Sequence, residues 1–117
     1  MQIHIKRVYE EAAPTDGYRV LVDRLWPRGV KKEDAKLDLW AKDIAPTTQL
    51  RQWFHHEAPK WSDFKAKYHT ELSQSPHFSQ FLSELKKHQT ITFLIAANNE
   101  QHNHALALKD FVEEKMK

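Results

Sequence analysis

The chain has 117 residues, with 18 lysines and arginines against 16 aspartates and glutamates, eight histidines, two glycines and no cysteine. This length suits one domain with one core, and the lack of cysteine excludes disulfides, thiolate nucleophiles, cysteine-bound zinc and iron–sulfur clusters. Gly17 and Gly29 alone cannot form a G-x-G-x-x-G fingerprint, and they stand too far apart for a P-loop.

The net charge of +2 is unevenly distributed along the chain. Residues 1–32 carry seven basic and four acidic side chains, whereas residues 33–117 carry eleven and twelve. The excess of basic residues is densest over residues 19–32, where the single acidic residue is Asp23. The basic residues of this stretch are Arg19, Arg24, Arg28, Lys31 and Lys32. A local basic cluster in a nearly neutral protein favours a site for an anion.

The first part of the chain predicts two strands joined by a loop. Ile3 and Ile5 alternate with polar residues, which favours a strand near the N-terminus. Residues 18–23 have a β-branched, apolar centre that is typical of an inner strand. Pro27 and Gly29 end that strand, because proline cannot donate to a ladder and glycine lets the backbone reverse.

The middle of the chain predicts mainly helices. Residues 31–35 fit a short helical turn, and residues 37–44 fit either an extended segment or a helix. Three clearer helices follow, each with its buried side chains at helical spacing. Their starting signals are Thr47 or Thr48, Pro59, and Ser75 followed by Pro76.

The strongest predicted strand covers residues 90–96, and a last helix is expected from about Asn99. Since helices separate the strands at 18–23 and 90–96, we expect these two to be parallel. The link between the first two strands is short for a parallel crossover, so the first strand is either antiparallel or placed elsewhere in the sheet. The predicted fold class is α/β: one domain over residues 1–117, with a small, mainly parallel, three- to four-stranded sheet flanked by helices on both faces.

Ligands of open α/β sheets bind at the carboxyl ends of parallel strands. Two loops fall on that edge, over residues 23–29 and 97–104. In the first, the guanidinium groups of Arg24 and Arg28 match a phosphate or carboxylate. In the second, Asn98 and Asn99 precede a helix start whose backbone N–H groups would favour an anion. The alternative is that the 23–29 segment is a structural corner.

Asp23 and His104 are the candidate acid–base groups of this edge. Asp23 alternatively caps the following turn or neutralises the arginines. His102 and His104 are two residues apart, so on a helix they point in different directions and cannot readily share a metal. His55 and His56 are expected to satisfy the terminal carbonyls of a helix.

The segment Asp-Arg-Leu-Trp-Pro-Arg-Gly at 23–29 resembles the YeaO-like branch of the domain of unknown function 488 family. The resemblance extends over 6–9, 16–19, 37–50 and 103–105. It implies a small, cytoplasmic, bacterial α/β protein, and it brings no assigned activity. Relatives tend to have Ser-Ala-Lys-Asn after the last strand, where this chain has Ala96-Ala97-Asn98-Asn99, so any ligand contact made by that lysine is missing.

The residues therefore favour a site for a small anionic ligand, phosphate-like or carboxylate, with or without catalysis. The alternative is an interaction module that uses the exposed basic segment 19–32 against an acidic protein or RNA, and a third reading makes the 23–29 motif wholly structural. A cytoplasmic protein that spans no membrane is expected, because the N-terminus has no signal-peptide core and the apolar stretch 90–97 is too short. The sequence points to no particular cofactor.

Overall fold

Strand β4, Thr90–Ile95, forms the centre of the sheet in the computed structural model, which describes residues 1–55, 57–99 and 101–117. All of β4 after Thr90 is buried, as its continuous run of apolar and β-branched residues predicts. The sheet has four strands in the order β1–β4–β2–β3, and every pair is parallel. The other strands are β1, Gln2–Arg7, β2, Tyr18–Leu21, and β3, Leu39–Trp40.

The structure settles the direction of β1. It runs parallel to β4, with Gln2 opposite Thr90 and Arg7 opposite Ile95. A short link from β1 to β2 is compatible with this direction, because the two strands are not neighbours and β4 lies between them.

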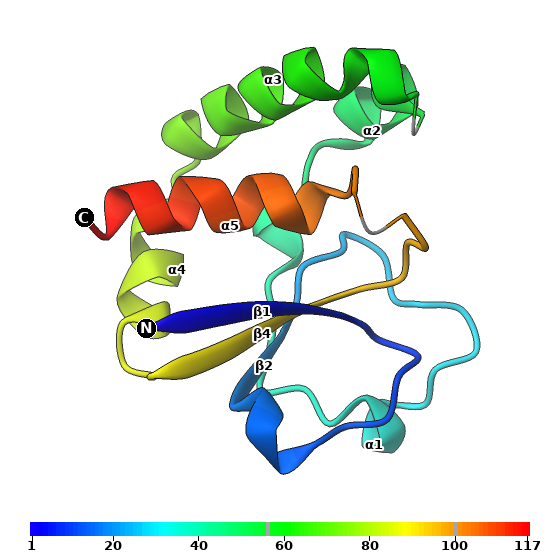
Figure 1. The fold of residues 1–117 in the computed structure, drawn as a ribbon, viewed down its shortest axis with the longest axis vertical. Coiled ribbons are helices and arrows are strands. Elements are labelled where there is room, and N and C mark those ends of the chain that lie inside the picture. The colour runs from blue at the N-terminus through cyan, green and yellow to red at the C-terminus, as the bar shows by residue number, and fades with distance from the viewer. Residues whose placement is uncertain (56, 100) are drawn as a thin grey trace.

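The four longer helices cover one face of the sheet (Figure 1). They are α2, Thr48–Phe54, α3, Trp61–Gln74, α4, Phe78–Leu85, and α5, His104–Lys115. Their buried side chains form one core with the inward residues of the strands, among them Phe64, Tyr68, Leu85, Phe93 and Leu108. The hydroxyl of Tyr68 donates to the carbonyl of Ile44 at 2.7 Å, which gives this buried polar group its partner.

The opposite face is covered by the short helix α1, Lys32–Ala35, and by connecting segments (Figure 1). Here Arg19 is buried and forms an ion pair with the buried carboxylate of Asp16, to which Lys6 also donates. The Arg19 guanidinium also donates to the carbonyls of Ala35 and Lys36 at the end of α1. The expectation that the basic segment 19–32 is exposed is therefore wrong at Arg19.

Several predicted boundaries can be compared with the structure. Thr47 caps α2, with its Oγ1 accepting from the N–H of Leu50. Residues 37–44, which were predicted to be either an extended segment or a helix, contain both β3 and a short 3-10 helix, η2, Lys42–Ile44. The last helix does not begin near Asn99: its N-cap is Asn103, whose side chain accepts from the N–H of Leu106.

Two further 3-10 helices, η1, Pro14–Asp16, and η3, Ala58–Lys60, lie in connecting segments. Gly17 follows η1 with a φ of 66°. A Cβ at this position would stand 2.3 Å from the carbonyl oxygen of Thr90, so glycine is required both by the backbone conformation and by the close approach to β4.

Candidate functional site

A cavity of about 540 Å³ opens at the carboxyl ends of β2 and β4, and we call it the strand-end cavity. The small side chains of Ala96 and Ala97 directly after β4 leave this space, and the aromatic rings of Phe54 and Phe64 line it. Its polar lining comes from the loop after β2, from α2 and from the region where α5 begins: Asp23, Thr48, Arg51, Gln52, His55, His102 and His104.

Asp23 and His104 meet in this cavity, so the structure brings together the two predicted acid–base candidates. Oδ1 of Asp23 lies 3.0 Å from Nε2 of His104, and Oδ2 accepts from the N–H of Ala96 at 2.9 Å. Nε2 of His104 also lies 3.0 Å from the carbonyl oxygen of Val22. The Asp23 and His104 side chains are only 15% and 13% exposed, so this largely shielded network links the ends of β2 and β4 to the start of α5.

Arg51 is the one lysine or arginine among the described residues that line the strand-end cavity, and the sequence analysis did not single it out. Its side chain is exposed and has no hydrogen-bond or ion-pair partner in the described part of the chain. Thr48 and His55, three and four residues from Arg51 on α2 and at its C-cap, line the cavity beside it, as does the neighbouring Gln52. The polar face of α2, which lies away from the buried Leu50 and Phe54, is the sequence signal that could have indicated Arg51.

The two arginines of the 23–29 motif lie elsewhere. Arg24 donates from Nε to the carbonyl of Pro46 at 3.2 Å and from Nη2 to the carbonyl of Ala45 at 2.9 Å. It therefore holds the segment that leads into α2. Arg28 is exposed, and neither arginine lines the strand-end cavity with Asp23 and His104.

Asn98 and Asn99 line a separate, smaller cavity of about 180 Å³ beside Arg7. Oδ1 of Asn99 accepts from the N–H groups of Gln101 and His102, so it shapes the turn before α5. The Arg7 guanidinium donates to the carbonyls of Ala96 and Ala97. The predicted ligand residues are thus divided among several places on this edge of the sheet.

The rest of the 23–29 motif forms a corner. Nε1 of Trp26 donates to the carbonyl of Val30 at 2.7 Å, and its ring forms a T-shaped pair with the Trp40 ring at a centroid distance of 5.4 Å. Nε1 of Trp40 in turn donates to the carbonyl of Asp23 at 2.8 Å. Gly29 adopts a φ of 78°, which closes the turn. Much of this motif therefore positions Asp23.

The other histidines of the region have local partners or roles. The His102 ring packs against Trp61 at a centroid distance of 5.4 Å. His55 ends α2 in the left-handed conformation, and its N–H donates to the carbonyl of Arg51 at 2.9 Å. His56 lies outside the described residues. Within those residues, no group of three or more His, Asp or Glu side chains could hold a metal ion.

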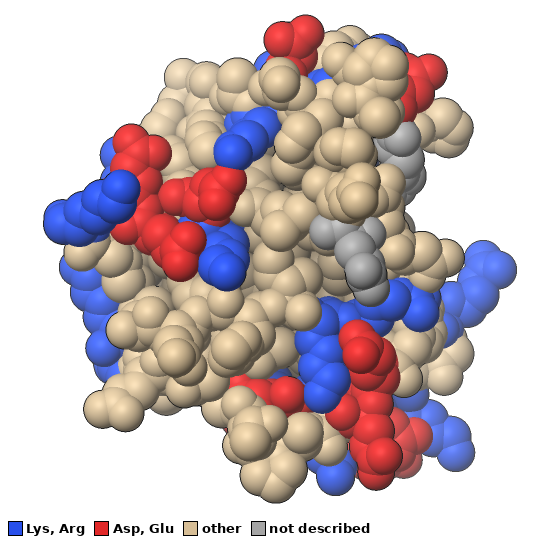
Figure 2. All heavy atoms as spheres, viewed as in Figure 1, with Lys and Arg blue, Asp and Glu red and all other residues tan. Residues whose placement is uncertain are grey.

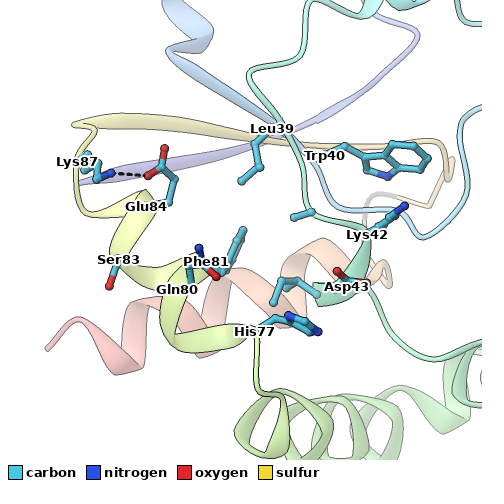
Figure 3. Close-up of a pocket in the computed structure, with 12 residues that line it drawn as sticks. Leu39, Trp40, Lys42, Asp43, His77, Gln80, Phe81, Ser83, Glu84 and Lys87 are labelled. Atoms are coloured by element: carbon cyan, nitrogen blue, oxygen red, sulfur yellow. Dashed lines mark ion pairs between the residues drawn. The ribbon is translucent and has the colours of Figure 1, made fainter.

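A third cavity, of about 390 Å³, lies between β3 and α4 (Figure 3). Leu39 and Phe81 form its apolar part, Lys42 and Asp43 line it from η2, and Glu84 and Lys87 form an ion pair of 2.9 Å at its edge. Its charges are mixed in sign and partly paired, so the lining indicates no ligand class.

The molecular surface also mixes charges. On the face in Figure 2, basic and acidic side chains lie next to each other. With Arg19 buried and Arg24 bonded to carbonyls, the exposed cations of the basic segment 19–32 are Arg28, Lys31 and Lys32. In the described chain, no helix combines the length and the apolar character needed to cross a membrane.

Comparisons with known proteins agree with the family resemblance. The sequence model described as "Inactive DUF488-N3 subclade" matches residues 2–117. The chain is 47% identical to the uncharacterised protein YeaO of Escherichia coli, over 96% of this chain and 97% of that protein. It is 39% identical to the uncharacterised protein Mb3100c of Mycobacterium bovis, over 92% of this chain and 90% of that protein. No solved structure matches the chain at a significant level.

Proposed function

Because the chain belongs to the inactive DUF488-N3 subclade, we propose that its strand-end cavity binds a small anionic molecule without transforming it. The subclade's description as inactive favours binding over turnover. The anion would carry a phosphate or a carboxylate.

The observation that carries this proposal is the guanidinium of Arg51, which lines the cavity and has no partner among residues 1–55, 57–99 and 101–117. A guanidinium is always charged and presents its donors in a fork that fits two oxygens of a phosphate or carboxylate. Asp23, the acidic side chain among the described lining residues, has both oxygens bonded to protein donors. Arg51 is thus the charged group that an incoming ligand meets.

The position of the cavity supports the same assignment. It lies at the carboxyl ends of adjacent parallel strands, β2 and β4, where ligands of open α/β sheets bind. Its volume admits a small metabolite, and its apolar wall of Phe54 and Phe64 would contact the uncharged part of the ligand.

Thermal unfolding with a panel of anions tests this function. The panel includes inorganic phosphate, sulfate, short carboxylates and nucleoside monophosphates. A ligand at ten times its Kd stabilises the folded state by about 1.4 kcal/mol, which raises Tm by several degrees. At least one anion should raise Tm of the wild type, and Arg51→Gln should abolish that rise.

Two arginine variants serve as controls. Arg28→Gln removes the same charge from an exposed position outside the cavity, and it should keep the full ligand-dependent rise. Arg24→Gln should lower Tm without ligand, because it removes the contacts to Ala45 and Pro46, and should also keep the rise. A rise that survives in Arg51→Gln, or no rise with any anion of the panel, contradicts the proposed function.

A further inference from the structure

We propose that the strand-end cavity selects anions that also carry an O–H or N–H group, and that Nδ1 of His104 accepts the hydrogen bond from that group. This inference rests on the proposed function and adds the chemical class of the ligand. Hydroxycarboxylates and sugar phosphates are molecules of that class.

The first step is the position of the hydrogen on the His104 ring. Nε2 lies 3.0 Å from the carbonyl oxygen of Val22 and 3.0 Å from Oδ1 of Asp23. A carbonyl and an ionised carboxylate only accept hydrogen bonds. Nε2 must therefore carry a hydrogen, and since a neutral imidazole has a single N–H, Nδ1 keeps its lone pair and accepts.

The second step is that this arrangement is held in place from several elements. Oδ2 of Asp23 accepts from the N–H of Ala96, so the carboxylate cannot rotate away from the ring. His104 is the first residue of α5 and follows the buried N-cap Asn103. The tautomer is thus set by contacts that exist before any ligand arrives.

The third step is that Nδ1 is open to a ligand. The ring contacts of His104 all involve Nε2, so Nδ1 has no partner in the described part of the chain. Among those residues, the fully buried side-chain nitrogen or oxygen without a partner is Nε2 of His88, so Nδ1 of His104 keeps some exposed surface. Since His104 lines the cavity and its Nε2 is already engaged, we infer that Nδ1 is the acceptor that its ring offers to the cavity contents.

Arg51 and His104 therefore make complementary demands on a ligand. Arg51 only donates, and it attracts the negative charge. Nδ1 of neutral His104 only accepts. When an anion without an O–H or N–H group fills the cavity, Nδ1 loses the hydrogen bond that it could accept from water. The loss of one hydrogen bond of this kind corresponds to about a three- to tenfold change in Kd.

The tautomer is tested without any ligand by ¹⁵N NMR of the histidine side chains at about pH 8, above the ordinary imidazole range. We expect His104 to show a protonated Nε2 and an unprotonated Nδ1. The opposite tautomer overturns the inference whatever the cavity binds. Asp23→Asn gives a second measurement, because an amide N–H facing Nε2 favours the opposite tautomer and should shift the population toward it.

The ligand class is tested with paired probes in which a hydroxyl donor is replaced by a methoxy group. Glycolate is compared with methoxyacetate, and 2-hydroxyethyl phosphate with 2-methoxyethyl phosphate, by NMR titration of the wild type and of Arg51→Gln. We expect the hydroxyl-bearing member of at least one pair to bind about three- to tenfold more tightly, and Arg51→Gln to weaken both members.

The outcomes separate this inference from the proposed function. If both members of each pair bind equally and Arg51→Gln weakens them all, the anion site stands and the donor requirement is overturned. If no probe binds, the proposed function fails for these anions and the inference fails with it. If the preference for the hydroxyl persists when Asp23→Asn has changed the tautomer, His104 is not the acceptor.

Discussion

Asp23 connects to His104 through one carboxylate oxygen, at 3.0 Å from Nε2, while its other oxygen holds the backbone N–H of Ala96 at 2.9 Å. One side chain thus ties the loop after β2 to the end of β4 and to the first residue of α5. The candidate site and the closure of the fold at the strand ends share this carboxylate.

Replacing Asp23 by Ala should lower the free energy of unfolding by about 2–4 kcal/mol. It leaves two partly buried donors, the N–H of Ala96 and Nε2 of His104, with weaker or missing partners, and each costs about 1–3 kcal/mol. Urea denaturation measures the change. Asp34→Ala, at an exposed position of α1, is the matched control and should change stability little. Equal stability of the two variants would refute the structural role.

The buried ion pair of Asp16 and Arg19 should make the stability of the protein depend on pH in the acidic range. Burial raises the pKa of Asp16, but hydrogen bonds from the N–H of Ala13, from Lys6 and from Arg19 outweigh it and leave the pKa below its ordinary value. A lowered pKa in the folded state stabilises the protein above the unfolded value of about 3.9, and this contribution is lost as the pH falls through the folded value.

Asp16→Asn should therefore flatten the fall in stability on acidification, and urea midpoints measured from about pH 6 to pH 3 check this. At neutral pH the variant should be less stable by about 3 kcal/mol, because the Arg19 charge stays buried without its counter-charge. An unchanged pH profile would mean that Asp16 does not titrate as described.

Gly17→Ala should destabilise the protein by at least about 2 kcal/mol, because it combines backbone strain with a steric clash. The new Cβ would meet the carbonyl oxygen of Thr90 at 2.3 Å. Gly29→Ala is the control: its φ is also positive, at 78°, but nothing lies within 4 Å of the added Cβ. Thermal unfolding should rank wild type above Gly29→Ala, and Gly29→Ala above Gly17→Ala; the reverse order for the two variants would contradict the close approach.

The phenol of Tyr18 should ionise at a higher pH than an ordinary tyrosine. Burial, together with the hydrogen bond to Glu84, raises the pKa of Tyr18 to about 12. Since the folded value exceeds the unfolded value of about 10, this phenol stabilises the fold below that pH, and the contribution is lost as the pH rises toward the folded value. Ultraviolet titration of the wild type minus that of Tyr18→Phe isolates this phenol, and a difference curve centred near pH 10 would show that the hydroxyl is not shielded.

Local sequence signals were enough to predict most of the fold. The strand at 90–96, the helix cap at Thr47 or Thr48 and the inner strand at 18–23 were predicted from signals within a few residues. The structure confirms them as β4, Thr90–Ile95, the cap at Thr47, and β2, Tyr18–Leu21. The direction and neighbour of β1 carry no such signal, because they are fixed by pairing with residues 90–95. The start of α5 was predicted too early, because Asn99 and Asn103 are equally suited to cap a helix and only the second does.

The candidate site was predicted less completely. Asp23 and His104 follow from the rule that ligands gather at the ends of parallel strands. Arg51 was missed because an arginine on a helix face resembles any surface arginine until the packing of α2 against the strand ends is known. Arg24 and Arg28 were predicted to bind an anion because of their charge. A guanidinium donates to backbone carbonyls as readily as it binds an anion, and Arg24 donates to the carbonyls of Ala45 and Pro46.

During synthesis β1 is made before the other strands of this sheet, yet its neighbour in the sheet, β4, is made after them. Until residues 90–95 are available, β1 has no strand to pair with, and β2 and β3 form a pair too short to be stable alone. The nascent chain therefore cannot assemble its sheet step by step, and pairing over such a long stretch of sequence slows folding. Assembly of the sheet should therefore wait until residues 90–95 have been made.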